Sequence, residues 1–415
     1  MSIKVKGFLK DVGGASRVTA LRQSSIDQAS AVPNPVDPIR NLADQLHPKH
    51  MQFRVIDIKD ASPNSKTFRF ESVDGHIPVF QAGQYVNFRF EIDGSTLSRP
   101  FSISSAPYEA RGEHPFFEIT VRRNRSYFVP DYLFEHVSVG SVLEGALPFG
   151  TFYWEPLRDS TEIVALAGGV GITPFYSLAK EIAHAVANEP TGEEAKLAAA
   201  GVKTLRDCHL TILYGSVKQD DIVLKDALDE IEKACPDHVK VVHVLSDEPD
   251  WPGEKGFVSR EIIEKYSAPG CTYLFCGPYP MYTFITKVME EMGISGKRFR
   301  HDAVGNPADV TKLAGYPAGK EKETYHITVC RGLEETVIEA AGTEPVAVAL
   351  ERAAIKIDTH CRNGECGFCR SELLEGEVFV SPVGDGRRLM DKEMGWFHPC
   401  SSWPLSDLKI KIPIM

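Results

Sequence analysis

Four cysteines near the C-terminal end of the sequence have the spacing of a metal-binding loop. Cys361, Cys366 and Cys369 form a C-x4-C-x2-C pattern, and Cys400 follows in the segment HPCSS. This spacing is typical of a [2Fe–2S] cluster held by four thiolates. A structural zinc site is the alternative, but such sites usually contain paired C-x2-C motifs. We therefore predict that these four cysteines bind a [2Fe–2S] cluster.

Three further segments have residues suited to binding a phosphate or a nucleotide. RPFSISS, residues 99–105, contains an arginine, whose guanidinium offers bidentate donors to phosphate. AGGVGITP, residues 167–174, lies between an apolar run and a helical pattern, where a helix N-terminus favours a pyrophosphate. CGPYPMY, residues 276–282, places a cysteine after another apolar run. An ion-paired arginine in a strand and a buried structural cysteine are the alternatives for the first and third segments.

The elements that must position these residues fall into a β-rich part and an α/β part. Residues 51–157 contain six short runs with strand alternation or β-branched residues, which predict an antiparallel β-barrel. Residues 158–305 alternate strand and helix patterns, which predict an α/β domain with a parallel sheet. AGGVGITP lies near the start of this second part, and CGPYPMY lies near its end.

The two ends of the chain differ from these parts. Residues 1–50 form an extension with seven basic and four acidic side chains, in which Ile39, Leu42 and Leu46 have helical spacing. Residues 306–323 have the composition of a linker. Residues 324–415 contain a predicted hairpin, a helix, the cysteine segment and a closing strand. We therefore expect a multidomain chain.

Along the chain, the motifs occur as RPFSISS, AGGVGITP, CGPYPMY and then the four cysteines. In this order they resemble those of the ferredoxin–NADP reductase superfamily, among the flavin reductases with a C-terminal plant-type [2Fe–2S] ferredoxin domain. The resemblance implies a β-grasp fold for residues 324–415. It also implies that Arg99 neutralises the flavin phosphate, that Phe101 lies against the flavin ring and that Ser102 forms a hydrogen bond near its N5 atom. Cys276 would position the nicotinamide, so Ser102 and Cys276 are the expected catalytic residues.

The same resemblance implies further cofactor-binding residues in the motifs and in the strands beside them. These are Pro100, Ser105, Val121, Arg122, Gly150, Thr151, Gly169, Gly171, Thr173, Pro174, Gly277, Pro278 and Met281.

Two cofactor choices remain open in the sequence. The family places a hydroxyl residue against the flavin phosphates where this chain has Pro130, so we expect FAD with FMN as the alternative. After the second strand of the α/β part, Asp220 and Asp221 would repel a 2′-phosphate, whereas Lys218 would attract one. We therefore expect NADH, with NADPH as the alternative.

The cofactors predict the reaction. A nicotinamide delivers a hydride, a [2Fe–2S] cluster accepts one electron at a time, and a flavin connects the two. We expect an NAD(P)H-dependent oxidoreductase that passes electrons to a separate redox protein, such as an oxygenase or demethylase component. The alternatives are a ferredoxin-like carrier without reductase turnover and a flavin enzyme that reduces a small molecule directly.

Composition limits the partners and the compartment. The formal net charge of −11 argues against nucleic acid, whose phosphates require a basic surface. No apolar run approaches the roughly 18 residues of a membrane span. The nine cysteines are an odd number in a chain of 415 residues, which does not suggest a disulfide framework. We therefore expect a cytoplasmic protein.

Overall fold

The computed structural model divides the chain into two units, Met1–Leu46 and His47–Met415, and describes residues 8–29, 37–123, 128–302, 305–307 and 309–413. The described part of the first unit forms two helices, α1 (Phe8–Asp27) and α2 (Pro38–Leu46). Helix α2 matches the helical spacing in the sequence, whereas α1 was not expected. Within the described ranges, no helix combines the length and the apolarity that a membrane span requires.

Six antiparallel strands form the first sheet of the second unit, in the order β4-β3-β6-β1-β2-β5. The isolated bridge between Ile103 and Ile119 joins the end of β4 to β5, so that the two outer strands meet as in a barrel. Strand β4 begins earlier than the RPFSISS motif, because Asp93 and Gly94 adopt positive φ angles of 51° and 80° and form a tight hairpin after β3. The elements are β1 (Met51–Ser62), β2 (Ser65–Ser72), β3 (Tyr85–Ile92), β4 (Ser95–Ser102), η1 (Pro107–Ala110), β5 (Phe117–Arg122), α3 (Phe128–His136) and β6 (Val142–Phe149).

A parallel sheet follows, in the order β10-β9-β8-β7-β11-β12. Its strands are β7 (Glu162–Gly168), β8 (His209–Ser216), β9 (Val239–Leu245), β10 (Glu254–Lys255), β11 (Thr272–Cys276) and β12 (Phe299–His301). Its helices are η2 (Gly169–Ile172), α4 (Thr173–Ala187), α5 (Gly192–Ala199), η3 (Leu205–Asp207), η4 (Gln219–Asp221), α6 (Lys225–Ala234), α7 (Arg260–Tyr266) and α8 (Tyr279–Glu291).

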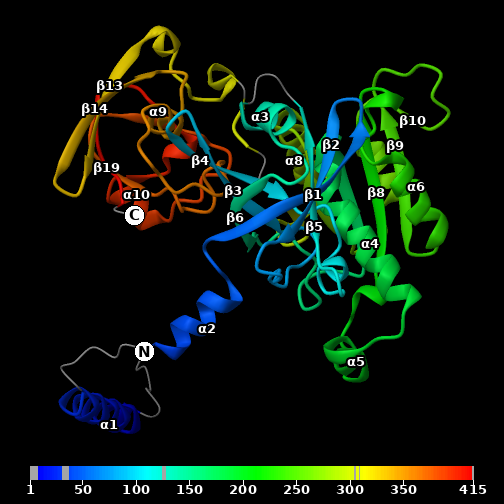
Figure 1. The fold of residues 1–415 in the computed structure, drawn as a ribbon, viewed down its shortest axis with the longest axis horizontal. Helices are drawn as coiled ribbons and strands as arrows, with labels where there is room; N and C mark the ends of the chain where they lie inside the picture. The colour runs from blue at the N-terminus through cyan, green and yellow to red at the C-terminus, as the bar shows by residue number, and fades with distance from the viewer. Residues whose placement is uncertain (1–7, 30–36, 124–127, 303–304, 308, 414–415) are drawn as a thin grey trace, which may run out of the picture. The chain divides into compact units, whose positions relative to one another are not determined.

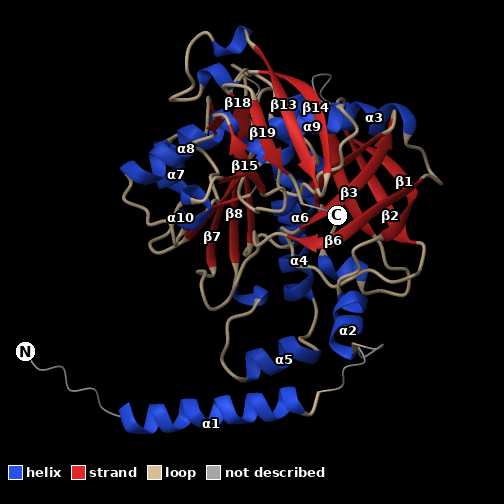
Figure 2. Ribbon diagram, turned by 90° about the vertical axis from the view of Figure 1, so that its left-hand side faces the viewer, coloured by secondary structure: helices blue, strands red, loops and turns tan. Residues whose placement is uncertain are grey.

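Helices cover both faces of this parallel sheet, as alternation along β7 shows. Ile163 and Ala165 belong to the core cluster that contains residues of α4 and α6. Val164 and Leu166 belong to a second cluster that contains residues of α7 and α8. Because successive strand residues point to opposite faces, the two clusters lie on opposite sides of the sheet. The expected α/β arrangement is confirmed, and Figure 2 shows its strands between helices.

The C-terminal part contains a five-stranded sheet in the order β14-β13-β19-β15-β17, in which β13 and β19 are parallel. This is the β-grasp arrangement that the sequence predicts. Residues 306–323 do not form an extended linker throughout, because Val310 and Leu313 pack on Trp403. The elements are η5 (Val310–Lys312), η6 (Lys320–Lys322), β13 (Thr324–Arg331), β14 (Glu334–Ala341), α9 (Val346–Arg352), β15 (Ser371–Glu375), β16 (Val378–Val380), α10 (Leu389–Glu393), β17 (Trp396–Phe397), η7 (Pro399–Ser401), β18 (Ser402–Pro404) and β19 (Leu408–Lys411).

Candidate functional site

A cavity of about 1240 Å³ lies between the barrel and the parallel sheet. Residues of the barrel strands β4 and β5 line one side, and the segments after β7, β8 and β11 line the other. Ligands of open α/β sheets bind at the carboxyl ends of the strands, which is where these segments lie. The cavity brings together eleven of the residues predicted from the sequence: Phe101, Ser102, Val121, Arg122, Gly169, Gly171, Thr173, Cys276, Gly277, Pro278 and Met281.

Close backbone packing explains the glycines on the nucleotide side of the cavity. A Cβ atom on Gly171 would lie 2.2 Å from the carbonyl oxygen of Cys276, and Gly169 has a φ of +55°. The 3-10 turn η2 leads directly into α4, and the Thr173 N–H donates to the Val170 carbonyl, so the N–H groups without helical partners are those at the start of η2, which lines the cavity. Such a helix start suits the pyrophosphate of a dinucleotide.

Cys276 lies at the end of β11 with its thiol next to an acidic residue. Its Sγ is 3.8 Å from Oδ2 of Asp302, and the same oxygen accepts a hydrogen bond from the Ser102 hydroxyl at 3.1 Å. Burial, together with the nearby carboxylate, raises the pKa of Cys276 well above its usual value. The side chain is therefore a neutral thiol at physiological pH.

Arg99, to which the resemblance gives a role at the flavin phosphate, pairs with an acidic residue of α9. The described residues that line the cavity do not include Arg99. Its guanidinium instead contacts Glu351 of α9, with Nη1–Oε1 and Nη2–Oε2 distances of 3.2 and 3.4 Å. The cations that do line the cavity are Arg122 and Arg123. Arg122 also pairs with Asp221 of η4 at 2.7 Å.

Five other predicted residues also lie outside the cavity lining: Pro100, Ser105, Gly150, Thr151 and Pro174. Ser105 is buried, and its hydroxyl accepts a hydrogen bond from the backbone N–H of Glu118 at 2.9 Å. Gly150 has a φ of +92° and packs on the Tyr85 ring. These two contacts support the barrel around the cavity.

Pro130 lines the cavity as the third residue of α3. A proline in the first turn of a helix breaks no helical hydrogen bond, because the N–H groups there have no helical partners. Residues 124–127 of the segment NRSYFVPDYL lie outside the described residues. Sequence reasoning also missed Arg123 and Asp302: the first is adjacent to a predicted residue, whereas the second belongs to no motif.

The four predicted cysteine ligands come together at one end of the C-terminal part. Cys361, Cys369 and Cys400 are buried, and Cys366 is exposed. The backbone N–H of Cys366 donates to Sγ of Cys361 at 3.3 Å, and hydrogen bonds from the thiols of Cys366 and Cys400 lower the pKa of Cys361. Gly364 has a φ of +90°, and a Cβ atom there would lie 2.2 Å from Oγ of Ser401. Four converging thiols fit a [2Fe–2S] cluster.

Aromatic side chains connect the barrel to the cysteine loop, by which we mean residues 360–370. The ring of Phe149, at the end of β6, contacts the ring of His360 edge to face at a centroid distance of 4.5 Å. His360 in turn stacks on Phe368 at 3.6 Å. On the barrel side, Tyr85 packs beside Phe149 at 5.8 Å. The cysteine loop thus lies directly against β3 and β6.

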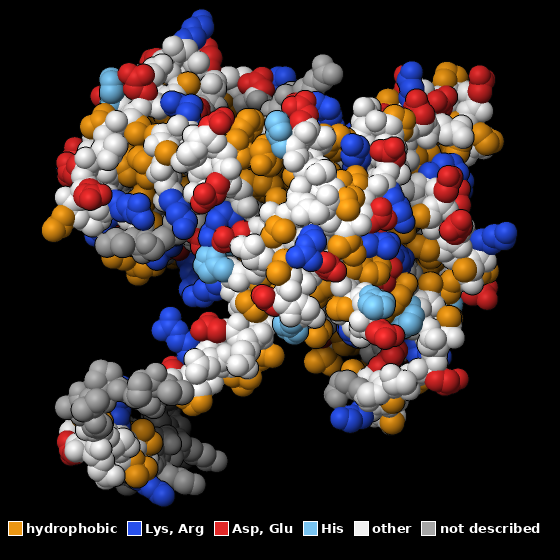
Figure 3. Space-filling model, viewed as in Figure 1, with side chains coloured by type: hydrophobic (Ala, Val, Ile, Leu, Met, Phe, Trp, Pro, Cys, Tyr) orange, Lys and Arg blue, Asp and Glu red, His pale blue; other side chains and the backbone are white. Residues whose placement is uncertain are grey.

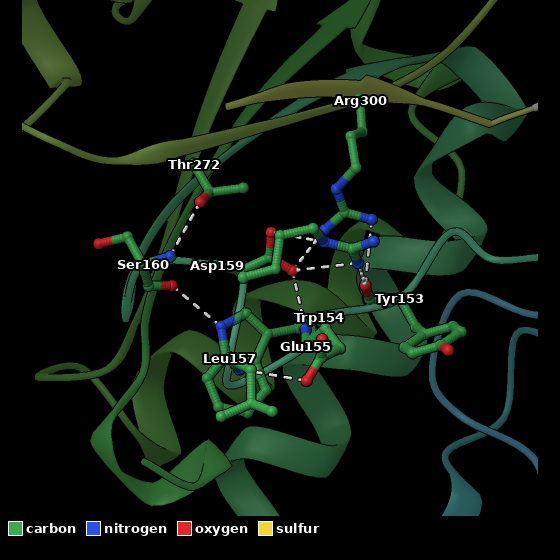
Figure 4. Close-up of polar contacts among 9 residues, drawn as sticks. Tyr153, Trp154, Glu155, Leu157, Asp159, Ser160, Thr272 and Arg300 are labelled. Atoms are coloured by element: carbon green, nitrogen blue, oxygen red, sulfur yellow. Dashed lines mark hydrogen bonds and ion pairs between the residues drawn. The ribbon is translucent and has the colours of Figure 1, made fainter. Parts of the chain in front are cut away.

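A buried ion pair holds the segment between β6 of the barrel and β7 of the parallel sheet, which we call the connecting segment (Figure 4). The carboxylate of Asp159 is fully buried and contacts the Arg300 guanidinium at 2.5 Å. Arg300 also donates to the backbone carbonyl of Tyr153 at 3.1 Å. The backbone N–H of Ser160 donates to the Thr272 hydroxyl at 2.9 Å. These contacts attach the connecting segment to β11 and β12.

Strand β12 and the residue after it contact the barrel, the segment that leads from the barrel into the parallel sheet, and the cysteine loop. Arg300 contacts the connecting segment, His301 Nδ1 lies 3.7 Å from Glu365 in the cysteine loop, and Asp302 contacts Ser102 in the barrel. Consecutive strand residues point in opposite directions, which allows one short strand to make these different contacts. The sequence contains no motif that predicts this strand.

Three family models match the chain in the order of these parts. The oxidoreductase FAD-binding domain matches residues 52–154, the oxidoreductase NAD-binding domain matches residues 165–287, and the 2Fe-2S iron-sulfur cluster binding domain matches residues 329–404. The first two matches contain the described residues that line the cavity except Asp302, and the third contains all four cysteines.

Known proteins resemble the chain over most of its length. The glycine betaine monooxygenase reductase subunit of Chromohalobacter salexigens is 26% identical over 365 residues, which cover 83% of this chain and 91% of that protein. NADH-cytochrome b5 reductase 1 of Mycosarcoma maydis is 27% identical over 252 residues, covering 60% and 70%. The structure of phthalate dioxygenase reductase has the same fold, with a TM-score of 0.58 at 20% identity and coverage of 88% and 98%.

The cavity, the cysteine loop and the three matched models agree on the cofactors. The chain is an oxidoreductase with binding domains for FAD, for NAD(P)H and for a [2Fe–2S] cluster. Because these three domains follow one another along the chain, it has the domain set of an electron-transfer reductase with a C-terminal [2Fe–2S] domain, and it resembles the ferredoxin–NADP reductase superfamily.

Proposed function

We propose that the chain takes a hydride from NADH and passes its two electrons, one at a time, through FAD and the [2Fe–2S] cluster to a separate redox protein such as an oxygenase or demethylase component. The observation that carries this proposal is the position of the cysteine loop against the barrel. The Asn87 side chain in β3 donates to the backbone carbonyl of Thr359 at 3.0 Å, immediately before the cysteine loop. This contact holds the cysteine loop beside the flavin-binding barrel, and such proximity suits electron transfer from flavin to cluster.

We propose the following roles for the residues of the cavity. Ser102 and Cys276 orient the flavin ring and the nicotinamide, because both contact Asp302 from opposite sides of the cavity. Gly169, Gly171 and the start of α4 hold the dinucleotide phosphates. The other cavity residues predicted from the sequence complete the two sites.

We further propose that the chain consists of an extension, three domains and a linker. The domains are the flavin-binding barrel at 51–157, the NAD(P)-binding domain at 158–305 and the [2Fe–2S] domain at 324–415. Residues 1–50 are the extension and 306–323 the linker. The change of sheet after β6 and again after β12 supports these boundaries.

The charges next to β8 favour NADH over NADPH. Asp247 lies 3.6 Å from Lys218 Nζ and neutralises the cation that would attract a 2′-phosphate. Asp220 follows in η4, and Glu248 accepts a hydrogen bond from the backbone N–H of Gln219 at 3.2 Å. These acidic side chains would repel a further phosphate.

The acceptor that we propose is a protein with a basic docking face. Residues 323–415 contain fifteen acidic and ten basic side chains, and charge complementarity accelerates encounter with such a partner. Figure 3 shows acidic and basic side chains interspersed over one face of this part, so the attraction would be diffuse rather than confined to one patch. The similarity to a monooxygenase reductase subunit supports an oxygenase component as the partner.

The test uses the full-length protein loaded with flavin and cluster under anaerobic conditions. We expect NADH to bleach the flavin bands first and the cluster bands afterwards, and we expect the reduced protein to support turnover of a partner oxygenase. Absence of flavin bleaching by NADH would favour the ferredoxin-like carrier. Turnover of the acceptor by a Cys366→Ser variant without a cluster would favour direct reduction at the flavin.

A further inference from the structure

A buried carboxylate connects the flavin-binding barrel to the cysteine loop. Glu351 lies near the end of α9, and only 4% of its side chain is exposed. Arg99 of β4 contacts both of its oxygens from the barrel. Arg362, directly after the ligand Cys361, contacts the same two oxygens at 2.5 and 3.0 Å. One carboxylate therefore pairs with two guanidiniums, one beside each redox site.

Backbone contacts tie the same region together from both sides. The Ser95 hydroxyl, at the start of β4, donates to the carbonyl oxygen of Glu351 at 2.8 Å. Arg362 also donates to the Thr359 hydroxyl at 3.1 Å, and its φ of +57° is unusual for a residue with a side chain. Figure 1 shows β4 beside α9. The cysteine loop thus begins in a conformation that this ion-pair cluster holds.

The energetics of burial suggest that these charges serve geometry more than stability. Removing charges from water offsets much of their attraction, so a buried ion pair is weak evidence for stability. Bidentate guanidinium–carboxylate contacts, by contrast, fix both distance and orientation. Burial, with Arg362 nearby, lowers the pKa of Arg99 to about 10, so the guanidinium remains charged at neutral pH. The ion pairs of Arg99 with Glu351 therefore retain their charge at neutral pH.

We propose that Glu351 is a positioning residue for electron transfer from flavin to cluster: by pairing with Arg99 and Arg362 at once, it fixes the cysteine loop at a set distance from the flavin. The inference rests on the proposed route of the electrons. Each NADH yields NAD⁺, one proton that leaves to solvent and two electrons, and the cluster accepts these electrons singly. The contact between the two sites is therefore used twice for each NADH oxidised.

Electrostatics and positioning predict opposite effects when the negative charge is removed. In Glu351→Gln, two guanidiniums lose their counterion close to the cluster. The added positive charge favours cluster reduction, since net charge is among the factors that set the potential of an iron–sulfur cluster. Taken alone, that change would accelerate electron transfer. Loss of the fixed geometry would slow it, because small displacements of positioned groups cost on the order of 100-fold in rate.

The experiment compares Glu351→Gln with Glu344→Gln in the full-length holoprotein. Glu344 is a matched control, because it pairs with Arg352 within the C-terminal part and not with the barrel. After rapid anaerobic mixing with NADH, we expect flavin bleaching at an unchanged rate in both variants. We expect the rate of cluster reduction to fall by about tenfold in Glu351→Gln and to stay unchanged in Glu344→Gln. A displacement of a full ångström costs about 100-fold in rate, so a tenfold loss corresponds to a smaller displacement.

Two further measurements do not depend on turnover. The midpoint potential of the cluster should become more positive in Glu351→Gln, and hydrogen–deuterium exchange should increase in residues 87–99 and in the cysteine loop. Cluster reduction that is as fast as in the unchanged protein, or faster, would overturn the proposal. If NADH fails to reduce the cluster in the unchanged protein, the proposed function fails instead.

A milder variant keeps the proposal testable if Glu351→Gln does not fold. Ser95→Ala removes the hydroxyl that donates to the Glu351 carbonyl but leaves all three charges in place. We expect a smaller slowing of the same step, with increased exchange in residues 87–99 and no change in potential. Unchanged exchange together with an unchanged rate would contradict the proposal.

Discussion

The hydroxyl of Ser102 donates a hydrogen bond to Asp302 at 3.1 Å, although the two residues are 200 positions apart in the sequence. The same carboxylate oxygen lies 3.8 Å from Sγ of Cys276. Asp302 therefore connects the residue proposed at the flavin with the residue proposed at the nicotinamide. Hydride transfer requires these two rings to be held in one orientation, which gives this contact a measurable consequence.

The first prediction concerns Asp302. Replacement by alanine removes hydrogen bonds to a charged group, each of which contributes about 1.5–3 kcal/mol. We expect hydride transfer to slow by about 10- to 100-fold, since about 1.4 kcal/mol corresponds to a tenfold change in rate. Flavin bleaching in anaerobic stopped-flow experiments measures this step. Asp309→Ala, an exposed acidic residue nearby in the chain, is the control, and equal rates in both variants would disprove the role.

The second prediction concerns the backbone contact at Gly171. In Gly171→Ala the new methyl group would meet the carbonyl oxygen of Cys276, whereas nothing lies within 4 Å of a Cβ atom on Gly296. We expect Gly171→Ala to lower the free energy of unfolding by about 1–3 kcal/mol and to raise the KM for NADH. Gly296→Ala should leave both the free energy of unfolding and the KM for NADH nearly unchanged. Thermal unfolding and steady-state kinetics with an artificial acceptor provide the measurements.

The third prediction compares a buried and an exposed ion pair. Asp159→Asn leaves Arg300 buried without its counterion and should cost about 3–5 kcal/mol in the free energy of unfolding. The pair of Arg54 and Glu71 is exposed at 2.7 Å, so Glu71→Gln should cost about 0–1 kcal/mol. Urea denaturation followed by fluorescence distinguishes the two. Similar midpoints would mean that the Asp159–Arg300 pair does not hold the connecting segment.

The fourth prediction separates the cluster from the flavin. Cys366→Ser should abolish the visible bands of the cluster while flavin reduction by NADH continues at its original rate. Cys330 lies on β13 and is not one of the four predicted ligands, so Cys330→Ser should retain both sets of bands. Absorbance and EPR spectra of the purified variants provide the test. If flavin reduction is lost together with the cluster, the two sites are not independent.

The fifth prediction concerns the pH dependence of stability. Burial raises the pKa of Glu181 above its ordinary value of 4.5. The folded protein therefore holds the proton more tightly than the unfolded chain, and the free energy of unfolding should fall as pH rises from about 4.5 through the raised pKa. Glu181→Gln should flatten this part of the curve and stabilise the protein at neutral pH. Exposed Glu189→Gln should leave the curve unchanged.

Local patterns in the sequence predicted most of the site. The cysteine spacing, the Gly-rich turn and the helix after it depend on neighbouring residues, so their positions could be predicted without the fold. Strand β12 could not, because its three residues have no periodicity and its hydrogen bonds are made with β11. The contacts of Asp302 remained hidden for the same reason.

Arg99 shows a different limit of sequence reasoning. The RPFS motif predicted a role at the flavin phosphate, with an ion-paired arginine in a strand as the alternative, and Arg99 lies within β4 and forms an ion pair. Its partner Glu351 lies 252 positions away in a helix of another part, and no spacing rule connects the two. The same holds for Val310 and Leu313, whose burial depends on the distant Trp403.

The contacts of strand β12 have a consequence for building chimeric enzymes. His301 touches the cysteine loop, whereas Arg300 and Asp302 touch Tyr153 and Ser102, so a graft that exchanges only the iron–sulfur end at residue 324 would keep one side of the Glu365 contact and replace the other. A functional hybrid should therefore inherit β12 and the loop it touches from the same parent, whichever parent supplies the remainder.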